Sequence, residues 1–186
     1  MKITNVNIYG LNESIRAAKF PMSTNTETLT DEITDGISAL ARAPIGSGHD
    51  NWLNGVVVQF DLTASLKLWP QMQRYHFVDF VSSQSTMHKI SKFVNIRERC
   101  NSYVTEAAID NLQSLITRYE IDPTPENYLT ILYNIPTGFE LTARLTTNYR
   151  QLKTIYAQRK NHKLKEWREF CKWIKTLPES RLITDD

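Results

Sequence analysis

Three parts of the sequence carry residues whose types could support binding or catalysis. The first is a glycine-rich loop, the second a polar stretch that interrupts an apolar region, and the third a basic stretch near the C-terminus. An imidazole can stack on a flat ring, hydroxyl and amide groups can donate to a phosphate or a base, and a guanidinium donates paired hydrogen bonds while staying charged. The candidates are His49 in the first part, Arg74, His76, Ser83, Gln84, Ser85 and His88 in the second, and Asn148, Arg150 and Arg159 in the third.

Each candidate also has an ordinary structural interpretation. Arg159 shares its segment with many lysines and arginines, so it could belong to a solvated face. Asn148 is a favoured N-cap residue, and Arg150 could pair with a carboxylate. His49 could simply be exposed, and the serines of the second part could satisfy backbone groups of a turn. Tyr75, Phe77 and Phe80, which lie around Arg74 and His76 in the sequence, could equally be core residues.

Hydrophobic patterning predicts the elements that must position these residues. Alternating or β-branched runs predict strands over residues 3–9, 56–63 and 139–145. Apolar residues at spacings of three and four predict helices. The predicted helices lie at 11–19, within 23–43, at 66–73 with Pro70 in the first turn, at 105–119, at 126–133, and over 148–175 as two segments broken near 160–163. Residues 82–86 are expected to be irregular.

The bulk composition is that of one globular domain spanning residues 1–186, with 41% hydrophobic and 23% charged residues. Cys100 and Cys171 are the two cysteines and form no CxxC pattern, so neither a disulfide framework nor a metal site is expected. A net charge of +2 does not imply a nucleic-acid partner. No apolar stretch approaches the roughly 20 residues that span a bilayer, so we expect a soluble, cytoplasmic protein without a membrane partner.

The C-terminal motif carries a resemblance to a known family. Pro136 is followed by a predicted strand, then by Asn148, Arg150 and Leu152 at the opening of a helix, and Arg159 lies near the end of that helix. This order and spacing, without gaps, resembles the second half of the flavin-dependent thymidylate synthases. That family has a Leu-Pro turn, a strand and an Asn-x-Arg-x-Leu helix that ends in Leu-Arg.

Upstream segments extend the resemblance over roughly the whole chain. Gly48-His49 before an apolar strand is similar to the family's Gly-His loop. The stretch from Ser85 to His88 stands where the family has Ser-x-Arg-Tyr.

Two positions depart from the family pattern. The basic Arg-His-Arg triplet, which contributes to flavin binding in the family, is represented by Arg74-Tyr75-His76. The arginine that precedes the Leu-Pro turn and helps to hold nucleotide phosphate is replaced by Leu132.

The resemblance implies an α+β fold with a central, mostly antiparallel sheet flanked by helices. It implies a homotetramer that binds FAD and dUMP and methylates the pyrimidine at C5, with NADPH and methylenetetrahydrofolate as co-substrates and hydride from the reduced flavin. Arg159 would activate the pyrimidine as the catalytic cation. The flavin contacts would be His49, Arg74, His76, Asn148 and Arg150, and the nucleotide contacts Ser83, Gln84, Ser85 and His88.

Other functions stay open at this point. C5 hydroxymethylation of the same nucleotide is a close variant, because it needs only an altered flavin pocket. A non-catalytic nucleotide-binding or interaction protein could retain the fold. Nucleic-acid binding by the basic C-terminal helices ranks last, because Glu166 and Glu169 interrupt the charge.

Overall fold

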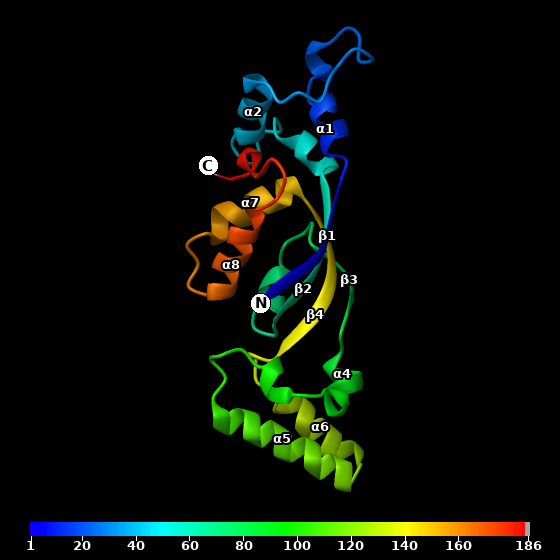
Figure 1. Ribbon diagram of the computed structural model, residues 1–186, viewed down its shortest axis with the longest axis vertical. Helices are drawn as coiled ribbons and strands as arrows, with labels where there is room; N and C mark the ends of the chain where they lie inside the picture. The colour runs from blue at the N-terminus through cyan, green and yellow to red at the C-terminus, as the bar shows by residue number, and fades with distance from the viewer. Residues whose placement is uncertain (185–186) are drawn as a thin grey trace. The chain divides into compact units, whose positions relative to one another are not determined.

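The computed structural model of the chain describes residues 1–184, which form an α+β fold (Figure 1). The strands are β1 (Lys2–Tyr9), β2 (Val57–Ser65), β3 (Asp79–Ser83) and β4 (Glu140–Asn148). The helices in this described part are α1 (Leu11–Ala17), α2 (Asp35–Arg42), α3 (Trp69–Met72), α4 (Thr86–Lys89), α5 (Glu106–Ile121), α6 (Pro125–Tyr133), α7 (Tyr149–Arg159) and α8 (Lys165–Ile174).

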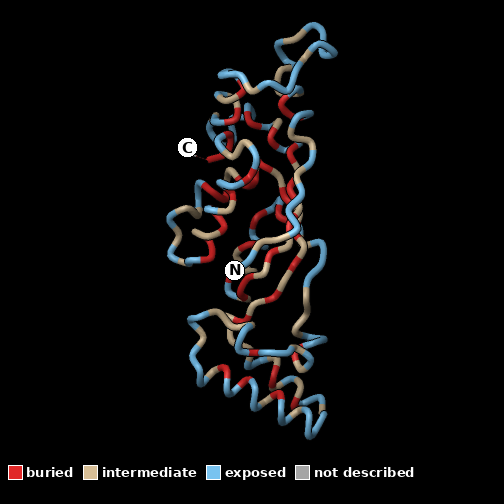
Figure 2. Tube along the Cα trace, viewed as in Figure 1, coloured by how far each residue is buried: buried red, intermediate tan, exposed pale blue. Residues whose placement is uncertain are grey.

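The four strands form one antiparallel sheet in the order β1-β2-β4-β3. Hydrogen bonds at both ends of the β2–β4 pair keep one register: the Leu66 N–H donates to the Phe139 carbonyl (3.0 Å), and the Tyr149 N–H donates to the Val56 carbonyl (3.0 Å). Buried residues alternate along β2 and β4, with the period of two expected of strands (Figure 2). The predicted α+β class with an antiparallel sheet is confirmed.

By its internal contacts the chain divides into two compact units, and the strands contribute residues to both. We call them the first and the second unit. The first unit comprises residues 1–4, 61–74 and 80–144, and the second comprises 5–60, 75–79 and the chain from Leu145 onward. The expectation of a single domain stays a prediction.

The first unit has an apolar core built by α5 and α6. Thr105 caps α5 by accepting from the Ala108 N–H, and Thr124 caps α6, where Pro125 occupies the first turn. The core members on α5 recur at helical spacing, and the short 3-10 helices before α5 and the start of β4 complete the core. The core residues are Ile90, Ile96, Ile109, Leu112, Ile116, Ile131, Phe139 and Leu141.

The second unit has an aromatic core between β2 and α8. The Phe60 ring lies 4.6 Å from the Trp173 ring and 5.9 Å from the Phe170 ring, measured between centroids. Trp167 is fully buried. Helices α7 and α8 meet at the break that the sequence predicts, and they pack against each other.

The structure differs from the predicted elements in two places. Within residues 23–43 only α2 is helical, because the polar side chains before it bond to their own backbone: Ser23 Oγ donates to the Asn25 carbonyl (2.8 Å), and Asn25 Oδ1 accepts from the Glu27 N–H (3.0 Å). The helix begins where Thr34 caps it by accepting from the Ile37 N–H. Strand β3 was not predicted, and it includes Ser83, which the sequence assigned to an irregular stretch.

No helix within residues 1–184 is both long enough and apolar enough to pass through a bilayer.

Candidate functional site

The residues predicted near the C-terminus lie on α7, which directly follows β4. Asn148 caps this helix, because its Oδ1 accepts from the Gln151 N–H at 2.8 Å. Arg150 lies in the first turn and Arg159 at the end, which corresponds to an axial separation of roughly 13 Å at 1.5 Å per residue. The capping interpretation of Asn148 is thus confirmed, and the two arginines occupy separate parts of one helix.

Arg150 forms part of a buried charge cluster around Asp50. The Asp50 side chain is fully buried, and its carboxylate accepts from Arg150 Nε (3.0 Å) and from Lys153 Nζ (2.8 Å). Lys153 Nζ also donates to the Ala43 carbonyl at 2.6 Å. A buried carboxylate requires such partners, because desolvation of an unpaired charge costs several kcal/mol. The cluster therefore holds residues 43–50 against the first turn of α7.

This pairing leaves part of the Arg150 guanidinium free to bind a ligand. Only Nε contacts Asp50, the terminal nitrogens make no hydrogen bond with the described residues, and the side chain keeps 28% exposure. The alternative that Arg150 pairs with a carboxylate is confirmed. The same contact directs the remaining donors of the planar group away from Asp50.

His49 is exposed at the tip of the loop that Asp50 anchors. Gly46 and Gly48 adopt φ angles of +93° and +81°, which suit glycine, and the His49 N–H donates to Ser47 Oγ at 3.4 Å. The loop continues into the short 3-10 helix Asn51–Gly55, where the buried indole N–H of Trp52 has no acceptor among residues 1–184. The loop thus presents an accessible imidazole and is followed by an unsatisfied donor.

Arg159 is held by aromatic side chains. Its Nε donates to the Tyr75 hydroxyl at 2.7 Å, and its guanidinium carbon lies 4.8 Å from the Trp167 ring centroid and 5.5 Å from that of Tyr75. The Tyr75 hydroxyl donates in turn to Gln158 Oε1 at 3.0 Å. Cation–π contacts and a hydrogen bond order this guanidinium, so Arg159 does not belong to a freely solvated face.

The segment that carries His76 is attached to the junction of β4 and α7. The Phe77 N–H donates to Gln151 Oε1 (3.4 Å), and Thr147 Oγ1 donates to the Phe77 carbonyl (2.7 Å). The His76 imidazole is exposed and lies edge-on to the Phe77 ring, with 4.7 Å between centroids. Arg74 is exposed, belongs to the first unit, and forms no hydrogen bond or ion pair with a described residue.

The charge of Arg159 lowers the pKa values of two neighbours, although burial is the larger influence on both. Burial lowers the pKa of His162, and Arg159 and Arg168 lower it further. Burial raises the pKa of the Cys171 thiol to about 11, against an opposing effect of Arg159. His162 Nδ1 accepts from the Leu164 N–H at 3.1 Å, which requires that nitrogen to be unprotonated. The end of α7 is therefore a positive environment.

The predicted nucleotide contacts all lie in the first unit, at the end of β3 and in α4. The Gln84 N–H donates to the Thr142 carbonyl (2.9 Å), while Gln84 Oε1 accepts from the Thr142 N–H (3.0 Å) and from Arg99 Nη1 (3.3 Å). The hydroxyl groups of Ser83 and Ser85 have no hydrogen-bond partner among the described residues, and Ser85 makes no side-chain cap for α4.

The interpretation of these serines as backbone-satisfying turn residues is therefore wrong. Ser83 and His88 are exposed and Ser85 is half-buried, so their polar groups are accessible.

Asp50 and Lys153 were not among the predicted site residues, and Tyr75 was named only as the middle residue of the triplet Arg74-Tyr75-His76. Asp50 and Arg150 are 100 positions apart, and no short motif links them. The available signal was the position of Asp50 directly after His49, in a loop where a solvated aspartate is ordinary. Within residues 1–184, no group of three or more histidine, cysteine, aspartate or glutamate side chains is arranged to hold a metal ion.

Of the comparisons with known proteins, only the one with solved structures finds matches. No protein-family model matches the chain, and no curated protein sequence matches it. Among solved structures, the chain is similar to a crystal structure of thymidylate synthase X (ThyX) from Helicobacter pylori with FAD and dUMP. The TM-score is 0.79 at 17% identity, over 100% of this chain and 98% of that chain. A second crystal structure, of the flavin-dependent thymidylate synthase ThyX from Helicobacter pylori complexed with FAD and dUMP, gives 0.78 at 16% identity, over 100% and 99%. The chain therefore has the fold of these structures along its whole length.

Proposed function

We propose that this chain is an FAD-dependent enzyme that methylates a pyrimidine nucleotide at C5, in the simplest case dUMP to dTMP. The observation that carries the proposal is the arrangement of α7. Its two predicted arginines are each held at Nε by one partner, Asp50 for Arg150 and Tyr75 for Arg159, so that their terminal donors remain available. The full-length likeness to structures that contain FAD and dUMP supports the same function.

The residues of the second unit fit a flavin dinucleotide. FAD carries a pyrophosphate and a ring system with several acceptor atoms. The free guanidinium donors of Arg150 suit an anion. The exposed imidazoles of His49 and His76 suit a ring with acceptors. When bound, the reduced flavin supplies the hydride for the reaction.

Asn148 has its side chain committed to the helix cap, so we assign it an orienting role at the start of α7. Arg74, in the first unit, is exposed and stays a proposed flavin contact.

Arg159 is the proposed catalytic cation. Negative charge develops on the pyrimidine ring during the reaction, and a fixed cation near the carbonyls lowers its energy. Tyr75 and Trp167 fix the guanidinium plane, which reduces the reorganisation needed when charge develops. A guanidinium also stays protonated at any relevant pH, so its role does not depend on titration.

The first unit supplies the proposed nucleotide contacts. Ser83 and Ser85 offer hydroxyl donors, Gln84 offers its amide N–H groups because only its Oε1 is engaged, and His88 offers an exposed imidazole. Such donors suit a phosphate or the edge of a base. We further propose a homotetramer with sites shared between subunits, and NADPH and methylenetetrahydrofolate as co-substrates.

The first test is flavin binding. The purified chain should show the absorption bands of oxidised flavin, or should bind added FAD more tightly when dUMP is present. Arg150→Ala should weaken FAD binding by about 10- to 100-fold, the usual range for hydrogen bonds to a charged group. Arg118→Ala is the matched control, because Arg118 is an exposed arginine on α5. Absence of flavin binding under all these conditions would favour the non-catalytic nucleotide-binding function.

The second test is turnover with FAD, NADPH, methylenetetrahydrofolate and dUMP. The mass of the nucleotide product separates methylation from hydroxymethylation. Arg159→Lys keeps the charge but removes the planar fork, and it should lower kcat by about 100-fold, as the loss of one transition-state donor does elsewhere. Full activity in this variant would refute the requirement for the planar guanidinium donors of Arg159.

A further inference from the structure

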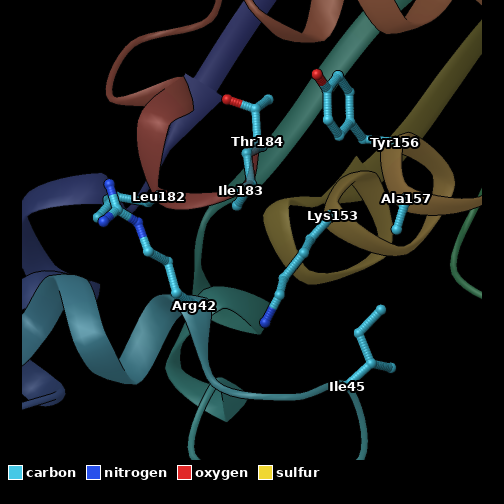
Figure 3. A pocket seen from close by; sticks show the side chains of 8 residues that line it. All are labelled: Arg42, Ile45, Lys153, Tyr156, Ala157, Leu182, Ile183 and Thr184. Atoms are coloured by element: carbon cyan, nitrogen blue, oxygen red, sulfur yellow. The ribbon is translucent and has the colours of Figure 1, made fainter. Parts of the chain in front are cut away.

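The second unit has an open pocket that none of the proposed flavin or nucleotide contacts lines. One of its lining residues, Lys153, belongs to the Asp50 cluster. Figure 3 shows that three segments line the pocket: the end of α2 with the loop after it, the middle of α7, and the C-terminal segment. Its volume is about 400 Å³, within the range of small-molecule sites of roughly 300–1,000 Å³. The lining residues are Arg42, Ile45, Lys153, Tyr156, Ala157, Leu182, Ile183 and Thr184.

The described lining of the pocket is electropositive. Among the residues within 1–184 that line it, Arg42 and Lys153 are cationic and none is acidic. Lys153 contacts the Asp50 carboxylate, which Arg150 contacts as well. One negative charge is therefore shared by two cations, and Arg42 adds a third positive charge. An anion is the ligand that this charge distribution favours.

Its two cations retain donors for a ligand. Arg42 is exposed and makes no hydrogen bond or ion pair with a described residue, and in Figure 3 its guanidinium extends toward Leu182. Lys153 Nζ uses two donors, for Asp50 and Ala43, and an ammonium has three. A long, unrestrained arginine side chain can turn toward a bound anion at small cost compared with a paired one.

The rest of the lining is mainly apolar. Ile45 leaves 53% of its surface exposed at the edge of the pocket, although large aliphatic side chains are usually covered. Leu182, Ile183 and the Tyr156 ring are buried side chains that form firm walls. A free inorganic anion would leave this surface wet, whereas an apolar group on the ligand would cover it.

We propose that this pocket binds a small organic anion, in which one acidic group pairs with Arg42 and the free donor of Lys153 while an aliphatic or aromatic body covers Ile45. The site is distinct from the proposed flavin and nucleotide contacts, and it does not require the proposed function to be correct. The only link between this pocket and the proposed flavin contacts is Lys153, which contacts the same Asp50 carboxylate as Arg150.

The test uses two fluorescent probes with the same aromatic body on the full chain. 8-Anilinonaphthalene-1-sulfonate carries an anionic group, and N-phenyl-1-naphthylamine is neutral. The sulfonate should bind once per chain, more tightly than the neutral probe, more weakly at high salt, and without displacement by FAD or dUMP. Arg42→Gln should lower the affinity for the sulfonate probe by about three- to tenfold, as expected for a partly exposed ion pair, and should leave the affinity for the neutral probe unchanged.

Two variants complete the design. Ala157→Trp places a large side chain in the pocket from an exposed position of α7 and should weaken both probes more than about tenfold. Arg16→Gln is the control, because Arg16 is a partly exposed arginine of the same unit that does not line the pocket. The proposal would be overturned if both Arg42→Gln and Ala157→Trp bound the sulfonate probe as tightly as the unmodified chain does. Absence of saturable binding to the unmodified chain would overturn it as well.

Discussion

Asp50→Asn removes the negative charge that Arg150 and Lys153 both contact while keeping the shape of the side chain. The carboxylate is fully buried, and its two charge-assisted contacts measure 3.0 and 2.8 Å. Removing one partner of a buried ion pair costs roughly 3–5 kcal/mol, because the remaining charge is left uncompensated. Here the cations keep 28% and 12% exposure, so water solvates them in part, and we expect a loss of about 2–3 kcal/mol in the free energy of unfolding.

Urea unfolding at pH 7 measures this loss, as a lower midpoint with an unchanged m-value. Asp61→Asn is the matched control: Asp61 contacts Arg144 at 3.2 Å, but both side chains are about a quarter exposed, so its loss should be about 1 kcal/mol or less. Asp50 also anchors the His49 loop, so Asp50→Asn should weaken the proposed FAD binding as well. Equal destabilisation by the two variants would refute the assignment of Asp50 as the centre of a buried cluster.

Three further predictions concern pH, thiol chemistry and backbone conformation. The pKa of His162 is lower in the folded chain, so the unfolded chain binds the proton more readily. The free energy of unfolding should therefore be full above about pH 6.5 and fall as the pH drops through the folded pKa. His162→Gln should reduce the change of the urea midpoint with pH between pH 7.5 and 5.5. An unchanged slope in the variant would contradict this. Because burial raises the pKa of Cys171 to about 11, its native thiol should react with Ellman's reagent at pH 8 far more slowly than in urea, and equal rates would show that it is accessible. Gly10→Ala places a Cβ 2.5 Å from the Gly55 carbonyl oxygen at a residue with φ of +73°, so thermal unfolding should reveal a loss of about 2 kcal/mol or more, whereas an unchanged Tm would show that the backbone shifts freely.

Local patterns predicted most of the elements because their causes are local. The caps Thr105 and Thr124, with Pro125 in a first turn, set the starts of α5 and α6 within one residue of expectation. The alternation along β2 and β4 and the break between α7 and α8 were equally readable. The stretch before α2 was mispredicted because Ser, Thr and Asn support both a helix cap and a series of turns, and only the packed chain selects between them.

The residues of the candidate site could be proposed from the sequence, but their contacts could not. The resemblance of their motif to a known family singled out Asn148, Arg150 and Arg159, and the cap at Asn148 could be anticipated from its type. The partners Asp50 and Tyr75 could not, since they lie 100 and 84 positions away from their arginines.

The sequence by itself determined the helices, the main strands, the α+β class and the concentration of cations near the C-terminus. The tertiary structure alone decided which of those cations are ordered and which donors they keep. The physical reason is that a charge is held by whatever burial and partners the fold places around it. Those partners come from segments that the sequence order does not connect.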